Sequence, residues 1–526
     1  MKMKKTALKI FCLIAALSLF SCANDNDEPR LVVITFDGLR WQEVYNGADS
    51  FLITHPDYVE DIEATKQAYW RATPEERREV LMPFTWSYIK DHGCLIGNRD
   101  LGSQMQVANI HWFSYPGYSE TFCGYADNER ITSNDAIPNP NVSVLEVANR
   151  DPRYHDSISV YTSWDVIPLA LNSERGEFPA NEGKAYSLDS IPDAVKSLLT
   201  ESDVNSDNIH LNFDHVTCAY ALNELTTRHP KVLYVAFGAT DECAHSGRYD
   251  QYLDATQAID NMIKRIVETC EADPYYKGKT TYLITTDHGR GYRRSFQHHG
   301  AGIEGAQQTW LMAFGKGIKK KGETSNNGPF YNQQVAATIA QLLGIEFTPD
   351  NGEVQLPITP DFKGEPIADY VPQLEFGDFP AVDFQPTANG VRFNYYEGEI
   401  LSVDQIDSCK VLASGVLPNF IIDKARAEDH FAYTFDTWLK VSKTGRYYLT
   451  CTSDDGSKMW IDDKLVFDAD GSHAACVSEA YLNLEEGYHH LFMKYFEDYE
   501  GQHLKLTMQT QDMPETVIPD SLLFYK

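Results

Sequence analysis

Three short hydrophobic runs in the chain each lead into an aspartate: "VVITFDG" into Asp37, "VLYVAFGATD" into Asp241 and "TYLITTDHG" into Asp287. Between residues 30 and 345, such runs alternate with helical patterns, which is typical of an α/β fold with a parallel sheet covered by helices. The ligand crevice of such a sheet lies beyond the carboxyl ends of its strands. We therefore expect the three carboxylates to converge at one edge of the sheet.

Three carboxylates in one crevice would repel one another strongly, and a bound cation removes that repulsion. Histidines stand at suitable positions: His245 lies four residues after the second aspartate, His288 follows the third, and His298 and His299 lie just beyond. Carboxylate and imidazole together suit Zn²⁺. A D-x-x-x-H pair alone often lies idle on a helix face, and "TTDHG" alone is explicable as a strand-end turn. Their combination favours a metal site.

The combination of these motifs resembles the alkaline phosphatase superfamily, specifically its phosphodiesterase and phosphomonoesterase branches, over about residues 30–345. Members hold two Zn²⁺ ions and a Ser or Thr nucleophile on a large, mostly parallel sheet, so the resemblance implies an αβα sandwich. The motifs "VVITFDGLRW", "TTDHG", "TDECAH" and "HHGAGIEGAQQTWLMAFG" carry the resemblance, which implies one ligand set of Asp37, Asp287 and His288 and a second of Asp241, His245 and His299. His299 precedes Gly300 and matches better than His298, which remains the alternative.

The same resemblance implies a nucleophile in "SYPGYSETFCG", which matches a [ST]-x-P-[GN]-H-like turn in its length, its Pro and its final Gly. Ser114 takes the nucleophile position and also binds the first metal. Tyr118 stands where His is common, and Ser119 falls in the helix expected after the turn. The implied mechanism is two in-line displacements, in which Ser114 attacks phosphorus, the second metal stabilises the leaving oxygen, and water hydrolyses the phosphoserine.

Two further positions bear on the substrate. Asn134 lies about where relatives place an asparagine that hydrogen-bonds a phosphoryl oxygen, although a turn-forming Asn explains "ITSNDAIPN" equally well. The Lys-x-Arg pair of some phosphomonoesterase relatives has no counterpart in "VYTSWDV", which leaves the choice between monoester and diester open. A sulfatase is the alternative activity, but Tyr118 occupies the arginine position of the sulfatase C/S-x-P-x-R motif.

The chain begins with a positive n-region followed by an apolar run from Ile10 to Phe20, which indicates a secretory leader too short to span a bilayer comfortably. Leu19-Phe20-Ser21-Cys22 resembles a bacterial lipoprotein signal, in which Cys22 becomes the lipidated first residue; a plain signal peptide is the alternative. The acidic "ANDNDEP" that follows resembles signals for the cell surface. We expect a signal peptide over 1–21, an acidic tether over 22–29 and an exported lipoprotein of a Gram-negative-type bacterium, held at the outer membrane or cell surface by its lipid alone.

The pattern changes after residue 345, and prolines are frequent over 346–388, where we expect a packed, extended connection. From 389 to 526, short β-rich runs between turns indicate an all-β sandwich. "NYYEGE", "SKTGRYYLTCTSDDGSKMWIDDKLV", "EEGYHHLFMKYFE" and "VIPDSLLFY" resemble the protective-antigen-type module. Glycan-binding members hold Ca²⁺ with adjacent aspartates, which Asp454 and Asp455 match; an ion-free hairpin turn is the alternative.

The formal net charge of -31 argues against a nucleic-acid partner, because phosphate binding needs a basic surface. The sequence thus predicts an exported two-zinc phosphoric ester hydrolase joined to a glycan-recognition module, with phosphorylated glycans as one substrate class. The alternatives are a sulfatase-like hydrolase and a non-catalytic, glycan-binding surface lipoprotein whose first domain is a retained scaffold.

Overall fold

The computed structural model describes residues 28–181, 191–204, 207–358, 378–499, 501–510 and 513–526. The predicted signal peptide, Cys22 and nearly all of the acidic tether lie outside these residues, as does the middle of the predicted Pro-rich connection. The chain divides into two compact units, one of residues up to 47 together with 78–368, and one of residues 48–77 together with 369–526. No helix in the described part is long and apolar enough to cross a membrane.

The segment 48–77 groups with the C-terminal unit, although the sequence placed it inside the first domain. It contains η1 (Leu52–Thr54), α3 (Ile62–Tyr69) and the start of α4 (Pro74–Leu81). Ser50 connects it to β21 (His503–Gln509), since Gln509 Nε2 donates to Ser50 Oγ at 2.7 Å and Ser50 Oγ donates to the Thr510 carbonyl at 3.1 Å. These hydrogen bonds join residues about 460 positions apart, a separation that sequence patterns do not report.

A seven-stranded sheet forms the centre of the first unit, in the order β4-β5-β1-β6-β8-β2-β9. Its strands are β4 (Ile158–Thr162), β5 (Val232–Phe237), β1 (Arg30–Phe36), β6 (Thr280–Thr286), β8 (Leu311–Gly315), β2 (Gly93–Ile96) and β9 (Gly322–Glu323). β8 pairs antiparallel with β6 and β2, and the other pairings are parallel. The mostly parallel sheet that the resemblance implied is therefore confirmed.

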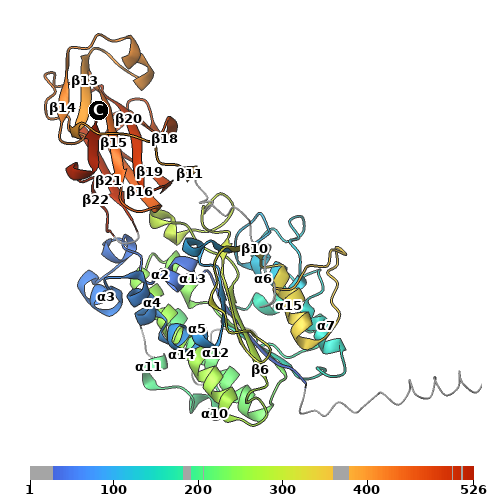
Figure 1. Cartoon of the computed structure of the whole chain (residues 1–526). Helices are drawn as coiled ribbons and strands as arrows, with labels where there is room; N and C mark the ends of the chain where they lie inside the picture. Colours follow the sequence, from blue (N-terminus) through green and yellow to red (C-terminus); the bar gives the residue numbers. More distant parts are fainter. Residues whose placement is uncertain (1–27, 182–190, 205–206, 359–377, 500, 511–512) are drawn as a thin grey trace, which may run out of the picture. The chain divides into compact units, whose positions relative to one another are not determined.

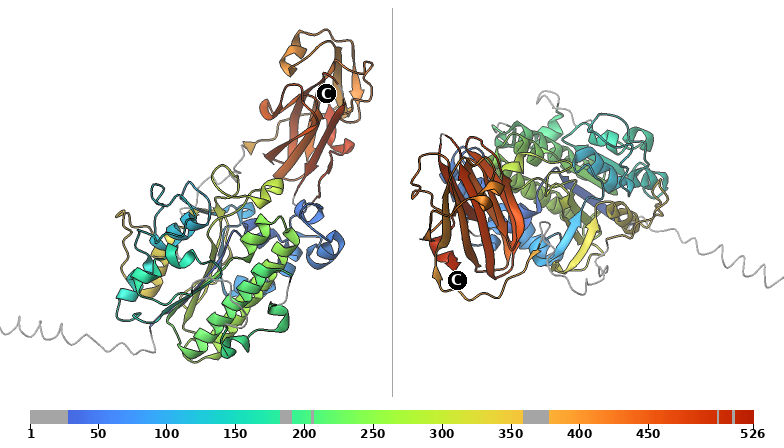
Figure 2. Two further views of the ribbon diagram at one scale, coloured as in Figure 1. Left: turned by 180° about the vertical axis from the view of Figure 1, so that it is seen from behind. Right: turned by 90° about the horizontal axis from the view of Figure 1, so that it is seen from above.

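Helices cover both faces of this sheet (Figures 1 and 2). The long helices α12 (Ile209–Thr227) and α14 (Tyr249–Ala272) lie on one face, and α6 (Ser114–Cys123), α7 (Val144–Arg150) and α15 (Gln334–Leu343) lie on the other. Alternate residues of β1 serve the two faces, because Leu31 and Val33 pack with the second helix group while the residues between them point the opposite way. The αβα sandwich predicted from the sequence is thus present.

The second unit is a β-sandwich of two mostly antiparallel sheets. One sheet contains β11 (Asp378–Phe379), β19 (Cys476–Leu484), β16 (Gly445–Asp454), β21 and β22 (Thr516–Val517). The other contains β12 (Ala388–Asn389), β23 (Leu523–Tyr525), β15 (Phe431–Val441), β20 (Gly487–Glu497), β17 (Ser457–Ile461) and β18 (Lys464–Ala469), with β13 (Val391–Glu397) and β14 (Ala413–Leu417) beside β15. Alternate apolar residues of both sheets fill the core between them.

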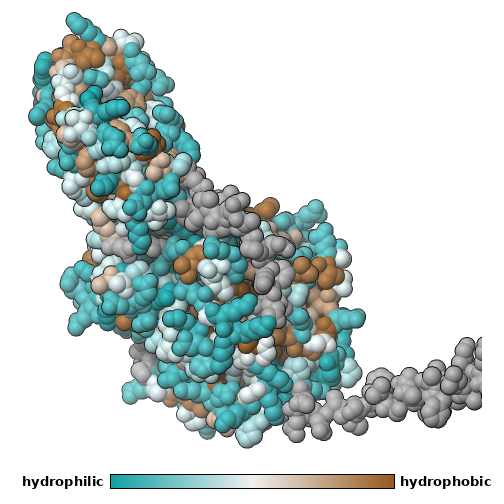
Figure 3. All heavy atoms as spheres, in the orientation of Figure 1, coloured by the Kyte–Doolittle hydropathy of each residue, from teal (hydrophilic) through white to brown (hydrophobic). Residues whose placement is uncertain are grey.

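The outer surface of each unit is largely hydrophilic on the face that Figure 3 shows. This agrees with the 23% of charged residues and the strongly negative net charge. Apolar side chains appear there singly or in small groups, as is usual for the surface of a folded protein.

Candidate metal centre

The three aspartates at the strand ends meet at one edge of the sheet because β5, β1 and β6 are parallel neighbours in register. Phe36 pairs with Phe237 on one side and with Thr286 on the other. Asp37 and Asp287 follow their strands directly, and Asp241 lies in the first turn of α13 (Ala239–His245), just after β5. The predicted convergence of carboxylates is therefore observed.

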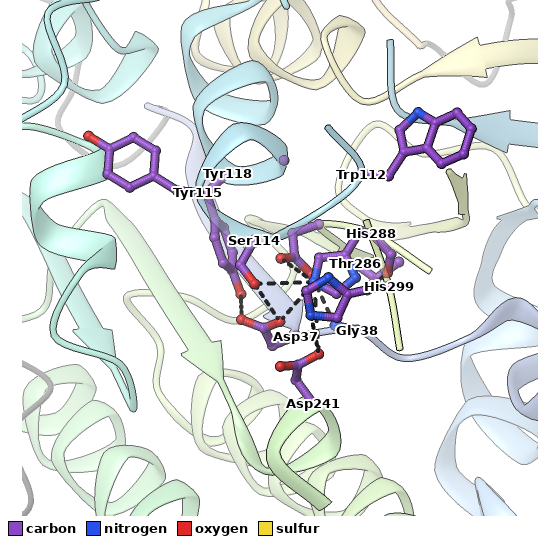
Figure 4. Close-up of polar contacts among 12 residues, drawn as sticks. Asp37, Gly38, Trp112, Ser114, Tyr115, Tyr118, Asp241, Thr286, His288 and His299 are labelled. Atoms are coloured by element: carbon purple, nitrogen blue, oxygen red, sulfur yellow. Dashed lines mark hydrogen bonds and ion pairs between the residues drawn. The ribbon is translucent and has the colours of Figure 1, made fainter. Parts of the chain in front are cut away.

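One group of ligand atoms comes from Asp37, Asp287 and His288, whose atoms lie within 4.8 Å of one another. His288 Nε2 lies 3.4 Å from Asp37 Oδ1 and 3.4 Å from Asp287 Oδ2. Ser114 opens α6 and places its Oγ 3.2 Å from His288 Nε2 and 3.4 Å from Asp37 Oδ1 (Figure 4). These are the residues that the sequence assigned to the first metal and the nucleophile.

A second group contains Asp241, His288 and His299. His245 lies beside it, with its Nε2 3.1 Å from Asp241 Oδ2 and 2.9 Å from His299 Nε2. His298 is exposed and belongs to neither group. The structure thus brings together the seven residues assigned to metals and nucleophile, with His288 common to both groups, and it places His299 rather than His298 among them.

Burial and neighbouring charges shift the pKa values of the carboxylates and histidines in the two groups. Burial and the Asp241 carboxylate raise the pKa of Asp37, and burial and Asp37 raise the pKa of Asp287 well above its usual range. Burial opposes a charged His288, but the surrounding carboxylates, Asp287 first, raise its pKa to about 9. Burial and the neighbouring His288 lower the pKa of His299 to about 2. Carboxylates that favour protonation beside a histidine that favours charge indicate a site whose electrostatics would be relieved by a divalent cation.

Two details of the donor atoms fit a metal. Asp287 Oδ2 is buried and has no hydrogen-bond partner among the described residues. His288 Nδ1 lies 2.8 Å from the Gly289 carbonyl, which places a proton on Nδ1, so Nε2 is the ring nitrogen that faces the carboxylates and Ser114 and that would bind a metal once deprotonated. Buried carboxylate oxygen and imidazole nitrogen are the donors that Zn²⁺ prefers.

Tyr118 makes a contact that the sequence did not reveal. It is fully buried, and its hydroxyl donates to Asp37 Oδ2 at 3.0 Å. Burial, followed by the Asp287 and Asp37 charges, raises the pKa of Tyr118 well above its usual value, so the phenol stays protonated and remains a donor. The tyrosine that departs from the family pattern therefore fixes one oxygen of Asp37, leaving Oδ1 on the side of Ser114.

Arg290 was missed by sequence reasoning. Its guanidinium is fully buried and bonds Asp241 Oδ1 through Nη1, while Nε donates to the Phe296 carbonyl at 2.9 Å and Nη2 to the Gln297 carbonyl at 2.7 Å. Burial favours a raised pKa for Asp241, but Arg290 and the histidines outweigh it and hold that pKa well below the usual range. A basic residue inside "TTDHGRG", three positions after a predicted ligand, was the available signal.

Gly38 permits the close approach of the two groups. Its φ is +60°, and its N–H donates to Asp287 Oδ1 at 3.1 Å. A Cβ at this position would lie 2.5 Å from Asp241 Oδ1. Any larger residue would therefore collide with a candidate ligand and strain the turn.

Asn134 is exposed and uses its side-chain oxygen for local structure. Its Oδ1 accepts from the backbone N–H of Tyr115 at 2.9 Å. The side chain consequently stands at the first turn of α6, next to Ser114. The position suits the predicted phosphoryl contact and the alternative turn function alike, because the amide group reaches the helix that Ser114 opens in either case.

The second unit holds a separate acidic group of Asp454, Asp455 and Glu497. Asp455 Oδ1 accepts from the His473 N–H at 2.7 Å, and Oδ2 accepts from the Asp498 N–H at 2.8 Å. Burial and the Asp455 charge raise the pKa of Glu497 to about 7. The pair predicted to bind Ca²⁺ therefore lies with a third carboxylate, and one of its members is already hydrogen-bonded to two loops.

Two family models match the chain. Residues 198–346 match the metalloenzyme superfamily, and residues 421–521 match the PA14 domain. No curated protein matches the chain. The two models cover the segment with Asp241, Asp287 and the histidines and the segment with Asp454 and Asp455.

Solved structures resemble the chain at low sequence identity. An anti-sigma factor domain-containing protein is 20% identical with a TM-score of 0.24, and the match covers 26% of this chain and 49% of that one, so the chain spans about half the length of that structure. The wild-type alkaline phosphatase PafA is 11% identical with a TM-score of 0.41, covering 63% of this chain and 99% of the other. A 2-O GAG sulfatase is 11% identical with a TM-score of 0.40, covering 64% and 75%.

Proposed function

Because the chain joins a domain of the alkaline phosphatase metalloenzyme superfamily to a PA14 domain, we propose that it is a two-zinc phosphoric ester hydrolase with Ser114 as its nucleophile. The observation that carries this proposal is the position of Ser114 Oγ, which is buried beside His288 Nε2 at 3.2 Å and Asp37 Oδ1 at 3.4 Å. A serine hydroxyl is a poor nucleophile unless its pKa is lowered.

Zinc ions held by the two groups would lower the pKa of the serine hydroxyl and neutralise negative charge on the reacting oxygens. The protein's own contribution is to position the serine hydroxyl. Ser114 is the first residue of the ten-residue helix α6, whose N-terminal end favours negative charge on the side-chain oxygen. Ser114 Oγ forms the bond to phosphorus as the ester oxygen leaves, and water afterwards cleaves the phosphoserine. The burial of Ser114, which keeps its hydroxyl out of bulk water, supports this role.

A phosphodiester suits this site better than a monoester, since a diester carries one negative charge fewer. The Arg290 guanidinium, which is the basic group in contact with the second ligand set, directs its N–H groups at Asp241 and at two backbone carbonyls. Three of its five N–H donors are therefore taken by the protein, and the side chain is fully buried. The segment "VYTSWDV" contains no Lys or Arg either.

The test is a panel of bis(p-nitrophenyl) phosphate, p-nitrophenyl phosphate and p-nitrophenyl sulfate with zinc-loaded full chain. We expect the diester to be cleaved fastest and Ser114→Ala to lose roughly 10³-fold or more in kcat. Ser119→Ala is the matched control, because Ser119 lies on the same helix but accepts from Asn139 instead of facing the metal groups. Wild-type turnover in Ser114→Ala would reject the nucleophile, fastest cleavage of the sulfate would favour the sulfatase alternative, and no cleavage at all would favour the binding-only alternative.

We further propose that the PA14 domain recognises glycans through Asp454 and Asp455 with Ca²⁺, which would bring the hydrolase to phosphorylated glycans. The close third carboxylate, Glu497, supports a hard-cation site there. Export and surface anchoring rest on the leader and on Cys22, which lies outside the described residues. If Cys22 carries the lipid, Cys22→Ser moves the protein from the membrane fraction to the soluble fraction; unchanged membrane association would reject the anchor.

A further inference from the structure

A cavity of about 520 Å³ opens on the second unit, away from the acidic group. Residues of five strands, β13, β14, β15, β20 and β23, line it, among them Arg392, Asn394, Ser414, Asp436, Phe492 and Tyr525. The volume falls within the range of roughly 300–1,000 Å³ that is usual for small-molecule sites. Figure 1 shows β13, β14, β15 and β20 beside one another in this sheet.

Strand alternation explains why these side chains face outward. The core of the sandwich takes the residues on either side of them, which are Val391, Phe393 and Tyr395 on β13, Tyr433 and Phe435 on β15, and Leu491 and Met493 on β20. Successive side chains of a strand point to opposite faces, so Arg392, Asn394, Thr434, Asp436 and Phe492 share the outer face. The cavity is therefore built mainly from the face that the sandwich does not need for its own core, and Phe393, which packs against the core, also lines it.

The strand register arranges the lining in two rows. In one row, Arg392 pairs with Val416 on β14 and with Asp436 on β15, and Asp436 pairs with Phe492 on β20. In the neighbouring row, Asn394 pairs with Ser414 and Thr434. A guanidinium and a carboxylate thus lie next to an amide and two hydroxyls, with an aromatic ring at the end of the first row.

Contacts within the cavity hold these groups in place. The Arg392 guanidinium bonds the Lys526 carbonyl through Nη2 and lies 5.4 Å from the centre of the Tyr525 ring. Asn394 Nδ2 donates to Thr434 Oγ1 at 3.3 Å. Asp436 Oδ2 lies 3.5 Å from His490 Nε2, with the Asp436 side chain 50% exposed. The lining is pre-arranged and accessible, which lowers the entropic cost of binding a ligand.

We infer that this cavity binds one or two rings of a neutral oligosaccharide, as a second glycan site of the PA14 domain. Amide, carboxylate and guanidinium groups can bond paired hydroxyls in two places at once, and aromatic rings such as Phe492 and Tyr525 can pack on the apolar face of a sugar ring. We expect the sugar to be neutral for two reasons. Arg392 and Asp436 are opposite charges on paired positions, and the chain's net charge of -31 disfavours an anionic polymer.

The site is distinct from the acidic group of Asp454, Asp455 and Glu497. Phe492 and Glu497 lie five residues apart on β20, which corresponds to roughly 16 Å along an extended strand. The cavity has one carboxylate, Asp436, and that carboxylate is paired across the strands with Arg392. Binding there should consequently require no Ca²⁺, unlike binding at an acidic pair.

The test titrates the full chain with maltotriose, mannotriose and cellotriose by calorimetry, once with excess EDTA and once with Ca²⁺. We expect at least one trisaccharide to bind in EDTA. Ser414→Trp fills the cavity from the exposed strand β14 and should weaken that binding by about tenfold or more, as should Asn394→Ala. Lys440→Ala, exposed elsewhere on β15, is the control and should bind as wild type does.

Three results would overturn the inference: no trisaccharide binds the wild type, binding requires Ca²⁺ and disappears in Asp454→Ala, or Ser414→Trp and Asn394→Ala bind as tightly as wild type. Circular dichroism and thermal melting of each variant distinguish a filled cavity from a disturbed sandwich. Ser414 is exposed on an edge strand, so its substitution should leave the melting temperature within a few degrees. The result is independent of phosphodiester hydrolysis, because Ser114→Ala should bind the same sugar.

Discussion

The chain holds two groups of carboxylates, and they differ in what already satisfies their oxygen atoms. In the first unit, Asp287 Oδ2 is buried with no hydrogen-bond partner among the described residues, and His288 and His299 stand beside it. In the second unit, both oxygens of Asp455 accept backbone N–H groups, at 2.7 and 2.8 Å. We therefore expect the first group to need a cation for charge balance, whereas Asp455 already serves the fold by joining two loops.

The comparison is tested most strongly by removing one carboxylate from each group. Asp287→Asn should remove one equivalent of bound zinc and lower kcat by roughly 10²–10³-fold or more, because the variant loses a buried charged ligand. Asp455→Asn, the matched change in the second unit, should leave zinc content and diester hydrolysis within about twofold of wild type. Elemental analysis after dialysis and initial rates measure both effects. Full zinc content in Asp287→Asn would contradict the contrast between the two groups.

A substitution of Arg290 should distinguish the two ligand groups of the first unit. This side chain positions Asp241 of the second group and fixes the loop before His299. Arg290→Gln should weaken the more weakly bound zinc by about 10–100-fold and leave the other in place. Competition with a chromogenic chelator measures the two affinities. Arg294→Gln, an exposed change in the same loop, is the control. Equal zinc binding in all three proteins would show that Arg290 has no positioning role.

The sequence predicted the convergence of Asp37, Asp241 and Asp287 because parallel strands in register align their ends, and this follows from local patterns. The same patterns are blind to strand direction, so the antiparallel course of β8 was not predicted. His298 follows the 3-10 helix η5 (Arg293–Gln297) and is exposed, whereas His299 joins a ligand group, and local patterns do not report which of two adjacent residues faces the carboxylates. The partners of Arg290 come from helix α13 and from carbonyls at residues 296–297, and such contacts exist only in the folded chain.

A milder change tests whether the first centre is held by hydrogen bonds as well as by a cation. Tyr118→Phe removes the donor to Asp37 Oδ2 and keeps the buried ring. We expect kcat to fall by about tenfold and the free energy of unfolding to fall by roughly 1–3 kcal/mol, because a buried acceptor loses its partner. Tyr115→Phe, whose hydroxyl donates to the Ile137 carbonyl at 2.6 Å on the same helix, is the control for activity. A wild-type rate in Tyr118→Phe would mean that Asp37 needs no such support.

The smallest effect is a dependence of the second unit's stability on pH. Burial and the Asp455 charge raise the pKa of Glu497 to about 7 from the usual 4.5, and its Oε1 has no hydrogen-bond partner among the described residues. Between these two pH values the folded protein binds more protons than the unfolded chain, so the free energy of unfolding falls as pH rises from about 5 to 7.

Glu497→Gln removes that titration, and the melting temperature of the variant should exceed that of wild type at pH 8 by a few degrees and match it at pH 5. Ca²⁺ at pH 8 should raise the melting temperature of wild type more than that of the variant, since only the wild type keeps all three carboxylates. If Ca²⁺ changes the melting temperature of neither protein, the Asp454–Asp455 pair is a structural turn. In that case only the carboxylate group of the first unit binds a cation. If Ca²⁺ stabilises wild type alone, the second group also needs a cation, and its contrast with the first reduces to the choice of metal.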